Sequence, residues 1–192
     1  MAISTTAPRS SPTSWTGRLE HIHIATAAAE PMRGLESCHL EAGIGIRDDR
    51  YATRTGTYSE RHHIDRQITL IESEVLEALA RDHHVRLEPH EHRRNLTTVG
   101  VPLGHLVGAY FSVGTCLLYG GRLNVPCRHL EQLTGKAVFR PLIHRSGLNA
   151  RVLVGGPIRV GEAIRPLADH EVDPAVRAAN EEHPLEAPPE VA

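Results

Sequence analysis

Short apolar segments bounded by glycine recur along this chain. Five of them are LEHIHIAT (19–26), GAYFSVG (108–114), TCLLYGG (115–121), ARVLVGG (150–156) and PIRVGEAI (157–164). Brief apolar or alternating runs between glycine turns are typical of β-strands. The sequence therefore predicts a mostly β fold, a barrel or a sandwich, with only a few helices.

One helix is predicted over residues 71–83, IESEVLEALARDH. Its apolar residues share one helical face, and its acids lie mostly on the other. This apolar face comprises Ile71, Val75, Leu76, Leu79 and Ala80. Thr69 and Glu72 have the spacing of a capping box at its start.

A second helix is predicted to begin near Pro126, because the fixed φ of proline suits a first helical turn. It runs through RHLEQLTG and ends at Gly135. Cys127 then lies in the first turn of this helix.

The chain of 192 residues fits a single domain, predicted over residues 19–167. Residues 1–18 are rich in Ser, Thr and Pro, and residues 168–192 in Pro, Ala and Glu. Both ends have too few apolar residues to offset the entropy of ordering and are predicted to be unstructured tails. The C-terminal tail holds seven acids and one base, so the rest of the chain is net positive. That favours a small anionic ligand, but the dense basic runs of a nucleic-acid binder are missing.

No apolar run approaches the roughly 20 residues that a membrane helix needs. The N-terminal sequence also lacks the pattern of a secretory signal, so we expect a cytoplasmic protein without membrane contact. The three cysteines, Cys38, Cys116 and Cys127, are odd in number and have no CxxC spacing. A reduced compartment suits them, and neither a disulfide framework nor a zinc knuckle is expected.

Cys127 is the candidate for chemistry among the three. The start of a helix favours a thiolate, which can ligate a soft metal, carry a persulfide or attack an electrophile. The alternative is a small buried apolar residue, because free cysteines are among the most buried residue types. Cys38 and Cys116 lie in strand-like or core segments, and no role is assigned to them.

Arg93, Arg94 and Asn95 form a second group, ahead of an extended segment. Guanidinium forks match phosphate and carboxylate groups. Since adjacent strand residues point to opposite faces, only one of the two arginines is expected to face a given ligand. A solvated or salt-bridged arginine pair is an equally good interpretation of these residues.

The sequence contains 14 histidines, including the pairs His90 and His92, and His62 and His63. No HExxH motif or matching third ligand accompanies these pairs, so a histidine metal site is not favoured.

Five segments, taken in order, resemble the MOSC domain, the module named for the C-terminal part of molybdenum-cofactor sulfurases. They are GIGIRDDRYATRTGTYS (43–59), RQITLIESEVLEAL (66–79), HRRNLTTVGVPLGHLVGAYFSVG (92–114), VPCRHLEQLTG (125–135) and HRSGLNARVLVGGPIRVGEAI (144–164). The resemblance spans residues 19–167.

The resemblance implies a β-barrel-like fold with a few helices. Cys127 matches the cysteine for which a persulfide-carrying or molybdenum-ligating role is proposed in the family. The residues that match its other motif positions, and are implied to bind the cofactor, are Arg93, Arg94, Asn95, Asp49, Arg50 and Arg145.

The sequence departs from the family pattern at two positions. Asp48 stands where the family turn often has glycine, which matters if that position needs a positive φ. Asn124 stands where many single-domain members have a further cysteine, so no disulfide partner for Cys127 lies there. The aminotransferase-like domain of the full sulfurases is also missing, and pyridoxal phosphate is not expected.

Three functions are consistent with the sequence. The first is a stand-alone MOSC protein whose Cys127 carries sulfur as a persulfide or ligates molybdenum cofactor, served by a sulfur donor or an electron-transfer protein. The second is a molybdenum-dependent reductase of N-hydroxylated compounds. The third is a binding protein in which Cys127 is inert.

Overall fold

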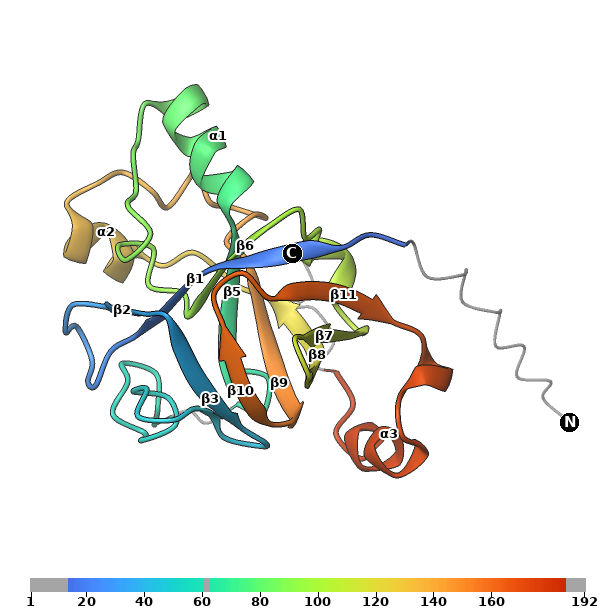
Figure 1. Cartoon of the computed structure of the whole chain (residues 1–192). Helices are drawn as coiled ribbons and strands as arrows, with labels where there is room; N and C mark the ends of the chain where they lie inside the picture. Colours follow the sequence, from blue (N-terminus) through green and yellow to red (C-terminus); the bar gives the residue numbers. More distant parts are fainter. Residues whose placement is uncertain (1–13, 61–62, 186–192) are drawn as a thin grey trace, which may run out of the picture.

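The computed structural model describes residues 14–60 and 63–185, and seven strands of this part close into a barrel (Figure 1). The strands are paired in the order β11-β7-β8-β9-β5-β6-β1, and pairing of β1 with β11 completes the circle. Their bounds are β1 Gly17–Ile24, β5 Ile68–Glu72, β6 Leu96–Val99, β7 Tyr110–Val113, β8 Cys116–Leu123, β9 Leu148–Val154 and β11 Ala163–Leu167. The predicted mostly β fold is confirmed.

The remaining elements attach to this barrel. Strand β2 pairs with β1, while β3, β4 and β10 form a separate three-stranded sheet. Three α-helices and two 3₁₀ turns complete the described part of the chain. Their bounds are β2 Arg33–Leu35, β3 Ser37–Glu41, β4 Gly45–Ile46, β10 Gly156–Arg159, α1 Ser73–His83, α2 Arg128–Thr134, α3 Pro174–Glu181, η1 Leu103–Leu106 and η2 Asp169–Glu171.

Helix α1 connects the parallel strands β5 and β6. A parallel pair needs such a crossover, because its strands cannot be joined by a tight turn. The helix begins at Ser73, two residues after the predicted start, and the predicted capping box is wrong. Thr69 lies in β5 and bonds Asn95, and Glu72 accepts a hydrogen bond from the Leu103 N–H at 2.9 Å. Strand pairing extends through residue 72, so Thr69 bonds Asn95 and Glu72 bonds the start of η1 instead of capping the helix.

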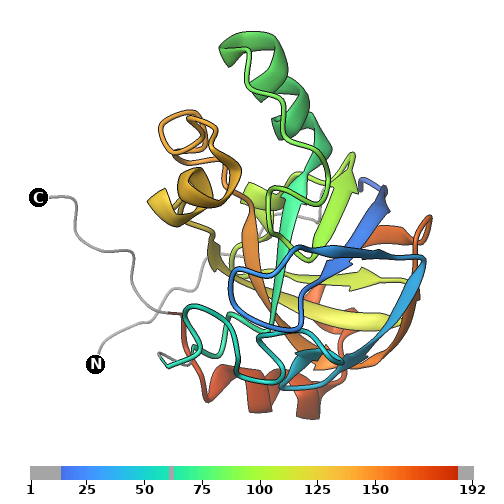
Figure 2. The ribbon, with the colours of Figure 1, turned by 90° about the vertical axis from the view of Figure 1, so that its left-hand side faces the viewer.

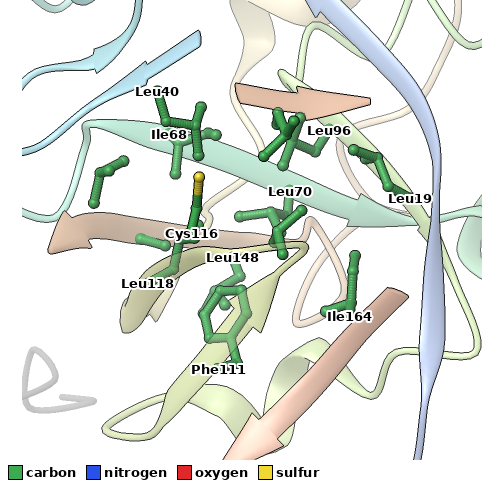
Figure 3. Packing of buried hydrophobic residues seen from close by; sticks show 14 of the residues in the cluster. Leu19, Leu40, Ile68, Leu70, Leu96, Phe111, Cys116, Leu118, Leu148 and Ile164 are labelled. Carbon is green, nitrogen blue, oxygen red and sulfur yellow. The ribbon is translucent and has the colours of Figure 1, made fainter. Parts of the chain in front are cut away.

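Apolar side chains from the strands fill the barrel (Figure 3). Leu148, Ala150 and Val152 of β9 point inward, so Asn149 and Arg151, between them, lie on the outer face. The same alternation puts Thr69 of β5 outside, between Ile68 and Leu70. Polar residues on the outer face of β5 and β9 are therefore available to a site on the barrel wall.

A second apolar cluster lies beneath α1 and α2. Ile71, Val75 and Leu79 pack there with Leu130 of α2. Helix α2 and the loop of residues 47–60 lie on the same side of the barrel (Figure 2). None of the helices in the described ranges is long and apolar enough to span a membrane.

The prediction of an unstructured C-terminal tail is wrong for residues 168–185. Helix α3 lies there, and its start is capped by Asp173, whose Oδ1 accepts a hydrogen bond from Ala175 N–H at 2.7 Å. Its buried residue is the polar Asn180, which contacts Arg151 of the barrel. The prediction rested on the low apolar content of this segment. Composition does not indicate that a helix can be held by hydrogen bonds of a polar side chain.

At the other end β1 begins at Gly17, two residues before the predicted boundary. The predictions for residues 1–13 and 186–192 lie outside the described residues.

Candidate functional site: an arginine-lined cavity beside Cys127

A cavity of about 270 Å³ lies on the outer wall of the barrel. It is formed by β5, the ends of β8 and β9, the loop before β5 and the segment that leads into α2. Its lining residues are Tyr51, Tyr58, Arg66, Thr69, Arg93, Arg94, Arg122, Leu123, Asn124, Val125, Pro126, Cys127 and Asn149. Among the described residues, this lining contains four arginines and one cysteine but no aspartate or glutamate.

Cys127 is the N-cap residue of α2, with an extended backbone at φ −133°. The helix ends at Gly135 in the left-handed conformation, as predicted, and begins one residue after Cys127. The half-buried Cys127 side chain packs against the second apolar cluster and also lines the cavity. The tertiary structure therefore places this thiol beside the arginines.

Arg93 and Arg94 both line the cavity, although adjacent residues of a strand would point to opposite faces. The expectation assumed strand geometry, but Arg93 has φ +61° and β6 begins only at Leu96. Arg94 is buried and donates from Nε to the Ser146 carbonyl oxygen at 3.0 Å and from Nη2 to Ser146 Oγ at 2.7 Å. Burial lowers the pKa of both guanidinium groups.

Arg66 and Arg122 complete the set of arginines, and sequence analysis did not find them. Arg66 precedes β5, donates to the Tyr58 carbonyl oxygen at 3.0 Å and lies 5.4 Å from the centre of the Tyr58 ring. Arg122 lies near the end of β8, where the register with β9 shifts between Gly120 and Arg122. The glycine pair at 120–121 was the one signal of this irregularity.

Arg50 and Asp49 stand behind the cavity and do not line it. Arg50 Nη1 lies 3.1 Å from Asp49 Oδ1, and both side chains are buried. The backbone N–H of Ala25 donates to the same Asp49 oxygen at 3.2 Å. Asp48 has φ +66°, so this turn does adopt the positive φ for which the family uses glycine.

Asn95 and Arg145 also lie outside the cavity lining. Asn95 is buried; its Oδ1 accepts hydrogen bonds from Thr69 Oγ1 at 2.8 Å and Thr69 N–H at 3.1 Å. The structure places the Arg145 guanidinium 2.6 Å from the Pro141 carbonyl oxygen and 3.0 Å from His83 Nε2. This side chain thus contacts the last residue of α1, His83, and not the cavity.

Tyr51 and Tyr58 line the cavity, and Tyr58 interacts with the thiol. The interaction with the Cys127 side chain, together with burial, raises the pKa of Tyr58 to about 12. Its hydroxyl thus stays protonated at neutral pH and can donate a hydrogen bond. Asn124, which stands where many relatives have a second cysteine, donates to Asn149 Oδ1 at 2.7 Å.

The histidines form no metal site within the described ranges, where no cluster of three His, Cys, Asp or Glu side chains could hold an ion. His92 is buried in a turn, accepts a hydrogen bond from Arg94 N–H at 2.9 Å and contacts Thr97 Oγ1 at 3.0 Å. His90 lies in the same turn, and His63 lies near Asp65 at 3.5 Å. The other residue of that pair, His62, lies outside the described residues.

The fold and the cavity define a class, a seven-stranded β-barrel domain with an arginine-lined cavity on its outer wall. The family model of the MOSC domain matches residues 41–165. The chain therefore belongs to the MOSC domain family, and this match lies within the predicted domain of residues 19–167.

Solved structures of other proteins share this fold. The YUAD protein from Bacillus subtilis is 18% identical, with a TM-score of 0.69 over 81% of this chain and 98% of that chain. YiiM from Geobacillus stearothermophilus is 14% identical, with a TM-score of 0.61 over 89% and 94%. YiiM from Escherichia coli is 14% identical, with a TM-score of 0.58 over 82% and 71%. A comparison with curated protein sequences gives no match.

Proposed function

We propose that this protein binds a molybdenum cofactor in the cavity and that Cys127 supplies its thiolate ligand. The observation that carries the proposal is that four arginines, Arg66, Arg93, Arg94 and Arg122, line one cavity together with Cys127. No carboxylate belongs to this lining within residues 14–60 and 63–185. Four guanidinium groups favour a ligand with a phosphate or another anionic group, because their forks match such oxygens.

The residues present fit the group that the family implies. The arginines would hold the pterin phosphate, and the amides of Asn124 and Asn149 offer hydrogen bonds along the same wall. A thiolate is a suitable ligand for a soft metal. The cofactor, when bound, supplies redox chemistry at molybdenum, and the chain binds, orients and shields it.

Persulfide carriage by Cys127 is the alternative, and the cysteine positions favour ligation over it. Cys38 and Cys116 pack with the barrel core, so neither lines the cavity, and Asn124 replaces the nearby family cysteine. Discharge of a persulfide would then require a thiol from another protein. Reduction of N-hydroxylated compounds is the activity to assay in cofactor-loaded protein.

Pyridoxal phosphate is not proposed, because it needs a lysine for its Schiff base. The sequence has a single lysine, Lys136. Its Nζ lies 2.6 Å from Glu91 Oε1, and it does not line the cavity.

The experiment is anaerobic expression in a host that synthesises molybdenum cofactor, followed by metal analysis and intact mass. We compare wild type with Cys127→Ser and with Cys38→Ser as the matched control. Molybdenum in wild type and Cys38→Ser, but not in Cys127→Ser, is the expected result. A wild-type protein that carries one extra sulfur atom but no molybdenum would contradict ligation and support persulfide carriage by Cys127. Neither species in the wild type would contradict both roles, and loaded protein without turnover of hydroxylamines would contradict the reductase.

A further inference from the structure

Arg151 is a fully buried arginine on the outer face of the barrel. It follows Ala150 in β9, whose side chain belongs to the core, so the Arg151 side chain points the opposite way. Only 1% of Arg151 is exposed. A charged group at this depth requires partners, because burial of an unpaired charge is costly.

The partners of Arg151 come from two distant parts of the chain. Its Nε lies 2.6 Å from Asp65 Oδ1, in the loop before β5. Its Nη1 donates to Asn180 Oδ1 at 2.9 Å and to the His183 carbonyl oxygen at 2.6 Å. Its guanidinium also lies 5.3 Å from the ring centre of Tyr119. We call Asp65, Arg151, Asn180 and His183 the Arg151 network.

Helix α3 contacts the barrel through this network. Asn180 is its buried residue, and Asn180 Nδ2 also lies 3.4 Å from the Tyr110 hydroxyl. A helix that buries an amide instead of an apolar face depends on the partner of that amide. The partner here is the charge of Arg151.

Asp65 links the network to the cavity at two points. It directly precedes Arg66, which lines the cavity. Its side chain also packs against Gly121 so closely that a Cβ at Gly121 would overlap it. Gly121 in turn directly precedes Arg122. The position of Asp65 therefore constrains both arginines that sequence analysis missed.

We propose that Arg151 is a positioning residue for the cavity. In this proposal Asn180 of α3 and His183, just after the helix, hold Arg151 and Asp65 in the arrangement that aims Arg66 and Arg122 at the anion. This proposal rests on the proposed function, since it assumes that the cavity binds an anion. Guanidinium recognition of phosphate oxygens is directional, so a small displacement of the forks weakens binding.

The test uses the full chain and inorganic pyrophosphate as the probe, with the dissociation constant measured by calorimetry at a temperature where circular dichroism shows every variant folded. Asn180→Leu removes the side-chain acceptor that α3 offers to Arg151 and keeps a similar volume. Asn180→Asp keeps an acceptor and serves as the conservative rescue. Glu171→Gln is the matched control, because it breaks the exposed ion pair with Arg165 in the same segment.

We expect Asn180→Leu to weaken pyrophosphate binding about three- to tenfold and the other two variants to stay within about twofold of wild type. A role of α3 in stability alone would lower the melting temperature of Asn180→Leu without changing the affinity of the folded protein, and that result would overturn the proposal. A wild type that does not bind pyrophosphate would contradict the anion cavity itself, and the positioning role would fall with it. The two failures are therefore distinguishable.

Discussion

The Arg50 side chain holds the main chain of Arg93: its Nη2 donates to the Arg93 carbonyl oxygen at 3.0 Å. Arg93 has φ +61°, an uncommon conformation for a residue other than glycine. A residue behind the cavity thus fixes the backbone of a residue that lines it. Arg50, which the family resemblance implies as a cofactor-binding residue, acts in this structure as a support.

Replacement of Arg50 by glutamine is expected to destabilise the fold. It leaves the Asp49 carboxylate buried without its charge partner, which costs about 3–5 kcal/mol of unfolding free energy. Urea denaturation measures the change. Arg47→Gln is the control, because its pair with Glu41 is more exposed and is worth about 0–1 kcal/mol. Equal losses of unfolding free energy in the two variants would contradict a stabilising role of the buried pair of Arg50 and Asp49.

Asn95 is expected to be a structural residue. Its side chain joins Thr69 of β5 to the His23 carbonyl oxygen of β1, which accepts from Nδ2 at 3.2 Å. Asn95→Leu removes these bonds in the core and should lower the unfolding free energy by about 2–4 kcal/mol. The folded fraction should bind pyrophosphate within about twofold of wild type. A large loss of affinity without a loss of stability would instead indicate direct ligand contact.

The three thiols are expected to react in a fixed order, with Cys127 first. Cys116 is buried, and burial raises the pKa of Cys38 to about 12. At about pH 8 a thiol with that pKa is ionised in roughly one molecule in ten thousand. Alkylation by iodoacetamide in native buffer, followed by peptide mass mapping, checks the order. Pyrophosphate should slow modification of Cys127, and preferential labelling of Cys38 would refute this ordering.

Stability is expected to fall at acidic pH because of His23 and His92. Burial lowers the pKa of His23 to about 4, with His21 and His90 contributing, and lowers that of His92 well below its usual value. The unfolded chain binds these protons near pH 6.5, so their protonation favours unfolding. These two histidines leave the unfolding free energy unchanged above about pH 6.5. Between about pH 6.5 and pH 4 each of them lowers it by up to about 1.4 kcal/mol per pH unit.

Urea unfolding between about pH 7 and pH 5 measures this decline. His23→Gln should flatten the pH dependence, whereas His39→Gln, on β3 away from this cluster, should leave it unchanged. A pH dependence that is identical in wild type and His23→Gln would show that His23 does not contribute.

Much of the fold was predictable because its signals are local. Glycine-bounded apolar runs indicated the barrel strands β1, β7, β8 and β9. Helix α2 was predicted to begin near Pro126, two residues before its first residue Arg128, and to end at Gly135, as it does. Predictions were wrong where a side chain forms hydrogen bonds with a residue far away in the sequence. Thr69 fits a capping box by spacing, yet it bonds Asn95, 26 residues away.

Some residues of the candidate site were predictable from local sequence, and others were found only in the tertiary structure. The sequence by itself determined that Cys127 begins a helix and that Arg93 and Arg94 stand ahead of a strand, because spacing and turn chemistry act over a few residues. Only the tertiary structure decided that Arg66 and Arg122 join them, that Arg145 turns away, and that α3 is attached through Arg151. Closure of the barrel fixes which outward side chains converge, and one residue's shift in strand register reverses the face on which each side chain lies.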